Sequence, residues 1–99
     1  MAAIQAEGGD KVVTVRGEVD AYSAPQLRAC LEEVAGSGQR RIVVDVSAMR
    51  FIDSSGVGVL VASIKRLRPD GRTLVLRRPT RQMTKILEIT GLRDLVAVD

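Results

Sequence analysis

The sequence predicts one α/β domain, residues 1–99, with a mixed, mostly parallel sheet of four to five strands and about three main helices. Two observations lead to this class. The β-branched run Ile42–Val46 is typical of a parallel strand that is covered on both faces. Three apolar stripes at helical spacing alternate with segments that have the pattern of strands. The predicted order is β-β-α-β-α-β-α-β, with right-handed crossovers between the parallel strands.

A hairpin and a helix are predicted for the first third of the chain. Gly8-Gly9-Asp10 is a turn signal between a short edge strand around Ile4 and a strand over residues 11–19. The helix is predicted to begin at Ser23, its N-cap, with Gln26 in the capping-box position. Its apolar stripe consists of Leu27, Cys30, Leu31 and Val34.

The central strand over residues 42–46 is followed by a predicted connection over residues 47–50. A second helix is predicted from near Ser55 to about Leu67. Its main apolar stripe consists of Val57, Leu60, Val61, Ile64 and Leu67. Val59, Ala62 and Ser63 lie off this stripe, which places them either in a partner-facing strip or beneath a further helix.

For the last third of the chain, the pattern predicts a strand over residues 73–76, a third helix and a final strand over residues 95–98. Thr80 is the predicted N-cap of this helix. Gly91 is its predicted C′ residue, followed by Leu92 in a position to pack back on the helix.

Composition indicates a cytoplasmic, free-standing domain. Of the residues, 45% are hydrophobic but only 2% are aromatic, so the core is expected to consist of aliphatic side chains. No signal peptide and no apolar run of membrane-spanning length is present, and we expect no contact with a membrane. Cys30 is the single cysteine, which excludes an internal disulfide, and its place on a helical stripe predicts a buried thiol.

Charge is distributed unevenly along the chain. Residues 1–53 carry 6 basic and 8 acidic side chains (net −2), whereas residues 54–99 carry 9 basic and 4 acidic side chains (net +5). With one Tyr, one Phe and no helix-turn-helix pattern, the sequence offers no platform for nucleic acid. We therefore expect no direct nucleic-acid binding and interpret the basic excess as a solvated surface.

Several catalytic classes are excluded by missing residues. The chain has no histidine, so a Ser-His-Asp hydrolase is excluded and zinc lacks ligands. It has no phosphate-binding loop, and we expect no metal, no cofactor and no catalytic residues. Lys65 lies roughly 15 Å beyond Ser55 along the predicted helix, too far to act as its base. An acid pair of Asp45 and Asp53 is interpreted as structural. The protein is therefore predicted not to be an enzyme.

The segment Phe51–Leu60 joins the central strand to the second helix and is the strongest candidate for a functional site. Asp53, Ser54 and Ser55 are all suitable N-cap residues, because their side-chain oxygens accept from free N–H groups of a first helical turn. Gly56 allows a close approach of the backbone. The segment is expected to present a hydroxyl at the positive end of a helix.

Three motifs resemble those of the STAS family, the bacterial anti-sigma factor antagonists. Asp45-Val46-Ser47 followed by segment 51–60 is similar to the family's signature. Gly17-Glu18-Val19-Asp20 resembles its second motif, and Thr90-Gly91-Leu92 its third. The motifs occur in the family's order and span nearly all of the chain, so the resemblance implies the STAS fold.

The resemblance also implies a function. It implies that Ser55 of this chain is phosphorylated by an anti-sigma factor that is a serine kinase. A PP2C-type phosphatase would remove the phosphate. The unmodified form would bind the anti-sigma factor and release the sigma factor in a stress response. Asp53 would orient the loop, and Ser54 would be an N-cap. The implied partner-binding residues are Asp20, Ala21, Tyr22, Asp53, Ser54, Ser55, Gly56, Val57 and Val59.

Two alternatives stay open at this point. One is a STAS scaffold that docks without switching, as in stressosome-type or transporter-associated members. The other is an enzyme that uses Ser55 covalently, which the missing base disfavours. Tyr22 is either an interface anchor or packs on the first helix. The sequence does not distinguish a monomer from a weak dimer.

Overall fold

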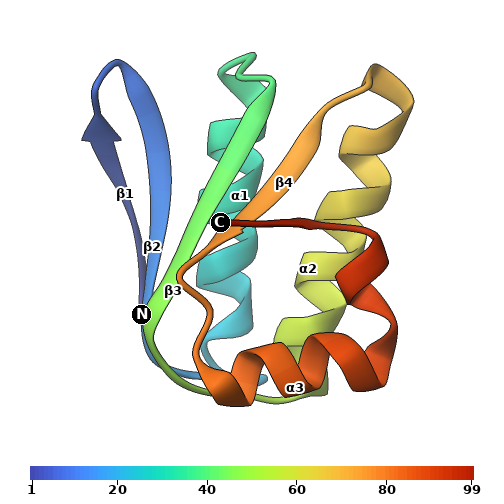
Figure 1. The fold of residues 1–99 in the computed structure, drawn as a ribbon. Helices are drawn as coiled ribbons and strands as arrows, with labels where there is room; N and C mark the ends of the chain where they lie inside the picture. The colour runs from blue at the N-terminus through green and yellow to red at the C-terminus, as the bar shows by residue number, and fades with distance from the viewer.

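The computed structural model describes residues 1–99 and confirms the predicted fold class and element order (Figure 1). One five-stranded sheet has the order β1-β2-β3-β4-β5, in which only the β1–β2 pair is antiparallel. The strands are β1 (Ala2–Glu7), β2 (Asp10–Val19), β3 (Arg41–Ile52), β4 (Thr73–Arg77) and β5 (Ala97–Val98). The helices are α1 (Ala24–Gly36), α2 (Ser54–Leu67) and α3 (Arg81–Thr90), with 3-10 turns η1 (Arg68–Asp70) and η2 (Leu92–Asp94).

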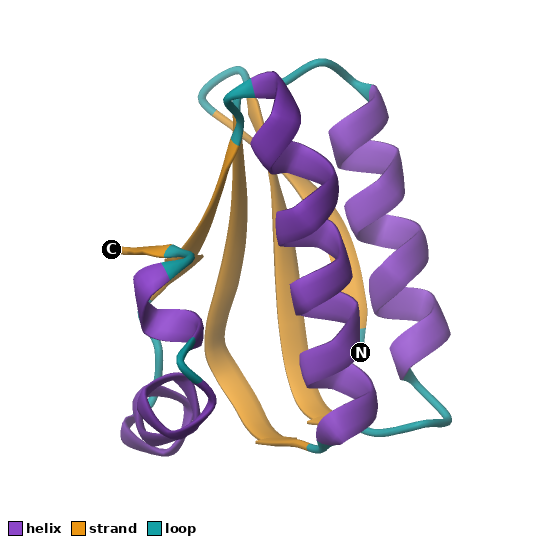
Figure 2. Cartoon of the chain, turned by 90° about the vertical axis from the view of Figure 1, so that its right-hand side faces the viewer, coloured by secondary structure: helices purple, strands orange, loops and turns teal.

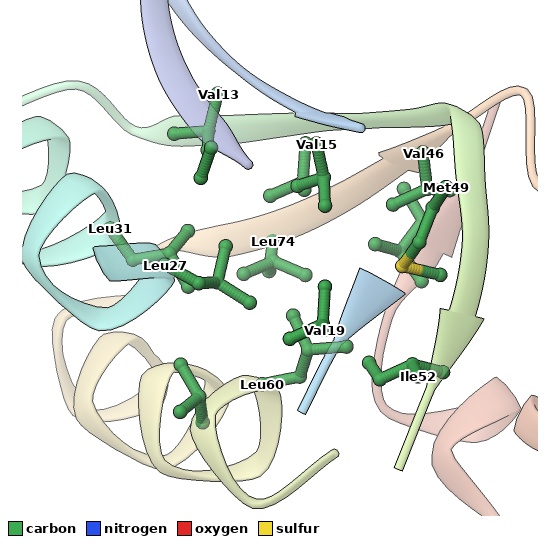
Figure 3. Close-up of a cluster of buried hydrophobic side chains, with 14 of the residues drawn as sticks. Val13, Val15, Val19, Leu27, Leu31, Val46, Met49, Ile52, Leu60 and Leu74 are labelled. Carbon is green, nitrogen blue, oxygen red and sulfur yellow. The ribbon is translucent and has the colours of Figure 1, made fainter. Parts of the chain in front are cut away.

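The helices form two groups relative to the sheet. Figure 2 shows α1 and α2 side by side on one face, while α3 lies on the opposite side, near the end of β3. Aliphatic side chains fill the space between the sheet and the α1–α2 layer, as Figure 3 shows for Val13 and Val15 of β2, Leu27 of α1 and Leu60 of α2. Alternate residues of the strands point into this core, which is the period expected for β structure.

A second, smaller cluster lies on the other face of the sheet. It consists of Val12, Val43 and Val75, which are directly paired across β2, β3 and β4. The central strand is thus buried on both faces. This explains why every residue of Ile42–Val46 except Asp45 is apolar.

The predicted connection over residues 47–50 is wrong, because β3 continues through it to Ile52. The register between β2 and β3 shifts twice, and each shift inserts one extra residue into β3. These irregularities break the alternation of buried and exposed residues, so Ala48, Arg50 and Phe51 all face solvent. The sequence of this segment therefore lacks a strand pattern although it is a strand.

The predicted start of α1 is correct in position but not in chemistry. The Ser23 side chain makes no cap hydrogen bond, and the side-chain Oε1 of Gln26 accepts from the Ala2 N–H instead of closing a capping box. Cys30 is half-buried rather than buried. Burial and, second, the nearby Glu33 carboxylate raise the pKa of the Cys30 thiol, which keeps it protonated at neutral pH.

The C-terminal elements follow the prediction except for the last strand. The Thr80 hydroxyl accepts from the Met83 N–H and caps α3, and Gly91 ends the helix with a φ of 75°. Leu92 is buried, as predicted. The last strand covers only Ala97–Val98, because the chain first makes the η2 turn.

Asp45 anchors the turn that leads from β4 into α3. Its carboxylate accepts from the Ser47 N–H at 3.0 Å and from the Ser47 hydroxyl at 2.7 Å, and it pairs with the Arg78 guanidinium. Arg78 has a φ of 53°, a left-handed conformation that costs roughly 1–2 kcal/mol outside glycine. Burial acts to raise the pKa of Asp45, but the hydrogen bonds from Ser47 and Arg78 outweigh it and lower the pKa.

Replacing Gly56 by alanine is expected to destabilise the domain. A Cβ atom at Gly56 would lie 2.6 Å from both Ile52 Cγ1 and Val19 Cγ1, so the end of the sheet would have to move. We expect the free energy of unfolding to fall by about 1–3 kcal/mol, measured by chemical denaturation. The matched control is Gly58→Ala on the same helix, where a Cβ meets nothing within 4 Å. It should stabilise by about 0.5–1 kcal/mol, and equal effects of the two changes would contradict this account.

Stability is expected to depend on Asp45 in acid. Because the folded-state pKa lies below the unfolded value of about 3.9, Asp45 stabilises the fold above that pH. This contribution is lost as the pH falls through the folded-state pKa. Asp45→Asn should therefore unfold more easily at pH 7 and show a shallower loss of stability below about pH 4, measured by denaturation at several pH values. An unchanged acid profile would refute this role, and Asp94→Asn, whose side chain is exposed, is the control.

Candidate functional site

The candidate site lies where β2 and β3 end. These strands are parallel, and Val19 pairs with Ile52 at their last residues. The Asp53 N–H then donates to the Val19 carbonyl at 3.0 Å. The loop after β2 and the first turn of α2 are therefore neighbours, at the lower end of the sheet in Figure 1. The structure brings together the Gly-Glu-Val-Asp and Asp-Ser-Ser-Gly segments, which lie about thirty residues apart in the sequence.

Asp53, not Ser54, is the N-cap of α2. Its carboxylate accepts from the Ser55 N–H at 2.9 Å and from the Gly56 N–H at 3.4 Å. The Asp53 carbonyl accepts the first helical hydrogen bond, from the Val57 N–H at 3.0 Å. The prediction that Ser54 caps the helix is wrong, because a carboxylate one residue earlier already occupies that position. Ser54 is the first helical residue and is exposed.

Ser55 is the second residue of α2 and is half-buried. Its N–H is held by Asp53, which fixes the backbone, but its hydroxyl makes no hydrogen bond within the chain. The hydroxyl thus lies at the positive end of a fourteen-residue helix without a structural partner. This geometry favours the addition of a negatively charged group, since the helix dipole stabilises an anion there.

Asp20 is committed to the structure of its own loop. Its carboxylate accepts from the N–H groups of Tyr22 and Ser23, each at 3.0 Å, and from the Ser23 hydroxyl at 3.1 Å. The hydrogen bond from the Ser23 N–H, and to a smaller extent that from the Tyr22 N–H, lowers the pKa of Asp20. Asp20 therefore holds the turn that carries Ala21, which is exposed.

Tyr22 projects from this turn with 91% of its surface exposed. It does not pack on α1, so that alternative is wrong. An exposed aromatic side chain at the tip of a well-ordered turn is a suitable anchor for a protein partner.

The three predicted site residues that follow Ser55 in α2 are buried or half-buried. Gly56 is buried against Val19 and Ile52, and Val57 is half-buried. Val59 is only 2% exposed and belongs to the main core. The prediction that Val59 contacts a partner is therefore wrong. The predicted stripe shares Leu60, Ile64 and Leu67 with the buried face of α2. It omits Gly56 and Val59, which are buried, and includes Val57 and Val61, which are only half-buried.

Sequence reasoning missed Phe51 as a surface residue of the site. It lies two residues before Asp53, and 45% of its surface is exposed. Strand parity does not predict this, because the register shift between Gly17 and Glu18 changes which side chains face outwards. No group of three or more His, Cys, Asp or Glu side chains is placed to hold a metal ion. None of the helices has the length and hydrophobicity needed to cross a membrane.

Comparison with known proteins agrees with the fold and the motifs. A family model described as "Mlab, STAS domain" matches residues 2–97. The anti-sigma-B factor antagonist of Bacillus subtilis (strain 168) is 36% identical over 91 residues, covering 90% of this chain and 81% of that protein.

Two solved structures are similar in fold. The crystal structure of an anti-sigma factor antagonist from Mycobacterium paratuberculosis superposes with a TM-score of 0.87 at 24% identity, covering 99% of this chain and 83% of the other. The Bacillus cell fate determinant SpoIIAA in its phosphorylated form gives 0.76 at 23% identity, covering 100% and 91%. On the family match and the sequence identity, the chain belongs to the STAS domain family.

Proposed function

We propose that this domain is an anti-sigma factor antagonist whose partner binding is switched by phosphorylation of Ser55. The unphosphorylated form binds a serine-kinase anti-sigma factor in the cytoplasm and thereby releases a sigma factor. The phosphorylated form does not bind, and a PP2C-type phosphatase restores it. The observation that carries the proposal is the uncommitted Ser55 hydroxyl at the start of α2. The names of the relatives and the existence of a phosphorylated form of SpoIIAA support it.

The fold should tolerate phosphorylation. A phosphoserine adds about −1.5 to −2 charges at neutral pH. At a helix N-terminus an anion is stabilised by about 0.3–1 kcal/mol, and repulsion from the Asp53 carboxylate offsets part of this gain. Because the Ser55 hydroxyl makes no hydrogen bond in the folded chain, its modification breaks none. The expected change in stability is therefore small.

Partner binding should be far more sensitive than folding. Burying a dianion at an interface without compensating partners costs several kcal/mol. A loss of about 3–5 kcal/mol is a factor of roughly 100 to several thousand in affinity, which is enough to release a submicromolar complex. Phosphorylation then acts by local exclusion at the docked surface. Refolding of the domain is not required.

The proposed contact surface is the exposed part of the predicted set. Ala21, Tyr22 and Ser54 face solvent, with Ser55 and Val57 half-buried beside them. Asp20 and Asp53 act indirectly, since their carboxylates hold the two turns that present these residues. In this proposal the protein is a binding partner and substrate of the kinase and has no catalytic role of its own.

Ser55→Ala is expected to abolish phosphate uptake while partner binding is retained. The measurement is intact-mass analysis with peptide mapping after incubation with ATP and the serine-kinase anti-sigma factor of the same organism. Ser54→Ala, which removes the neighbouring exposed hydroxyl, should still accept one phosphate and is the matched control. Phosphate on the Ser55→Ala protein would show that the assigned position is wrong. Tight binding without any phosphorylation of the wild type would instead favour a scaffold that docks without switching.

Ser55→Asp is expected to weaken binding to the same kinase by about 100-fold, or ~3 kcal/mol, in an isothermal titration. Its free energy of unfolding should stay within about 1 kcal/mol of the wild type, because the side chain lies at a helix N-terminus. Ser54→Asp carries the same charge one residue away and should bind more tightly than Ser55→Asp. A large loss of stability in Ser55→Asp would mean that Ser55 has mainly a structural role.

A further inference from the structure

The basic side of α3 is a surface that the proposed site does not use. We define the α3 face by Phe51, Arg81, Lys85 and Ile89. Ile89 is 77% exposed, the most exposed large aliphatic side chain within a helix, and Phe51 is 45% exposed. Arg81 and Lys85 are exposed as well. Apolar side chains with this exposure, bordered by charge, are typical of protein-binding surfaces.

The α3 face is continuous with the surface that carries Ser55. Phe51 lies two residues before Asp53, and a shallow depression between β3 and α3 is lined by Phe51 and Ile52 from one side and Gln82 and Ile86 from the other. At 3.6 residues per turn, Ile89 and Lys85 come next around α3, moving away from β3. Figure 1 shows α3 running across the end of the sheet at which α2 begins.

The net unpaired charge on the exposed face of α3 is positive. The carboxylates nearest to Ser55 are already engaged, because Asp53 caps α2 and Asp20 holds its own turn. Arg81 and Lys85, in contrast, form no ion pair, and the exposed Glu88 of the same helix, also without an ion pair, offsets only one of these two charges. A partner that places acidic side chains opposite Arg81 and Lys85 would therefore gain from these two cations, whereas a partner without acidic side chains there would not.

We propose that the interface around Ser55 extends over the α3 face, and that the partner presents an apolar patch bordered by acidic side chains. In this arrangement Phe51 and Ile89 pack against the patch, while Arg81 and Lys85 lie at its rim. The inference rests on the proposed function, since it enlarges the surface by which the same serine-kinase anti-sigma factor is bound. Nucleic acid fits the α3 face less well, because Ile89 lies between the cations and the only aromatic side chain nearby.

The test measures binding of the serine-kinase anti-sigma factor to Arg81→Glu/Lys85→Glu protein. Rim charges act mainly on association, so we expect an affinity about 10-fold lower at low ionic strength, a slower association rate and a weaker dependence on salt. Ile89→Ser should weaken binding mainly through faster dissociation. Thermal unfolding should be unchanged in both variants, because none of these side chains is buried.

The matched control is Arg40→Glu/Arg68→Glu, which changes the net charge by the same amount. Arg40 lies in the α1–β3 connection and Arg68 in η1, at the other end of the sheet, and both are exposed without an ion pair (Figure 1). Its affinity should stay within about twofold of the wild type. Equal weakening in the two double variants would show only a net-charge effect and would overturn the inference.

The remaining outcomes separate this inference from the proposed function. If Ser55→Asp abolishes binding but the α3 variants bind as the wild type does, the function stands and the extended interface is wrong. If the wild-type protein does not bind the kinase at all, both fall. If the α3 variants lose affinity for a DNA duplex but keep that for the kinase, the basic surface serves nucleic acid and the inference is overturned.

Discussion

Gly56 packs directly on Val19 and Ile52, and the position of the whole site depends on this contact. No side chain fits between the first turn of α2 and the ends of β2 and β3. The helix can therefore begin directly at the end of the sheet. There the Asp53 N–H donates to the Val19 carbonyl, and the Asp53 carboxylate accepts from two N–H groups of α2. A larger residue would push the helix away and break the cap and the strand-end hydrogen bond together.

Short polar side chains also hold the neighbouring turns by accepting hydrogen bonds. Asp20 accepts from backbone N–H groups of the turn after β2, Asp45 holds the turn between β4 and α3, and Thr80 caps α3. Each uses a short polar side chain to accept from N–H or guanidinium groups that would otherwise lack a partner. The hydroxyls of Ser54 and Ser55 differ, since neither makes a hydrogen bond within the chain, and the backbone of Ser55 is held in place by Asp53. A rigid frame around hydroxyls without hydrogen bonds is well suited to covalent modification that leaves the fold intact.

Exposure and charge differ between the two sides of this end of the molecule. On one side, Tyr22, Ser54 and Ser55 lie on turns held by internally paired carboxylates. On the other, α3 carries cations without partners beside the exposed Ile89. In the proposed interface, a docked protein that spans both sides would meet the turns around Ser55, where phosphorylation is proposed to act, and the cations of α3. Affinity and switching would then depend on separate residues, which allows each to be altered independently.

Several elements of this protein were determined by local sequence alone. The β-branched run of β3, the presence of three helices, the turn at Gly8-Gly9 and the end of α3 at Gly91 all follow from side-chain pattern and backbone preference within a few residues. The motif around Ser55 was likewise visible as a strand followed by capping residues and a glycine. These features are local, because hydrogen bonding and φ preferences act over short chain distances.

Other features were decided only by the tertiary structure. The extra residues in β3 depend on its register with β2, and they decide that Phe51 faces solvent. The choice of Asp53 over Ser54 as N-cap depends on the bond to Val19, and the burial of Val59 depends on which side of α2 meets the sheet. Arg78, which pairs with Asp45, and Ala2, which donates to Gln26, both come from distant parts of the chain. Pattern along the sequence determined which elements form, whereas contacts between elements decided their register and rotation, because those are properties of two surfaces and not of one segment.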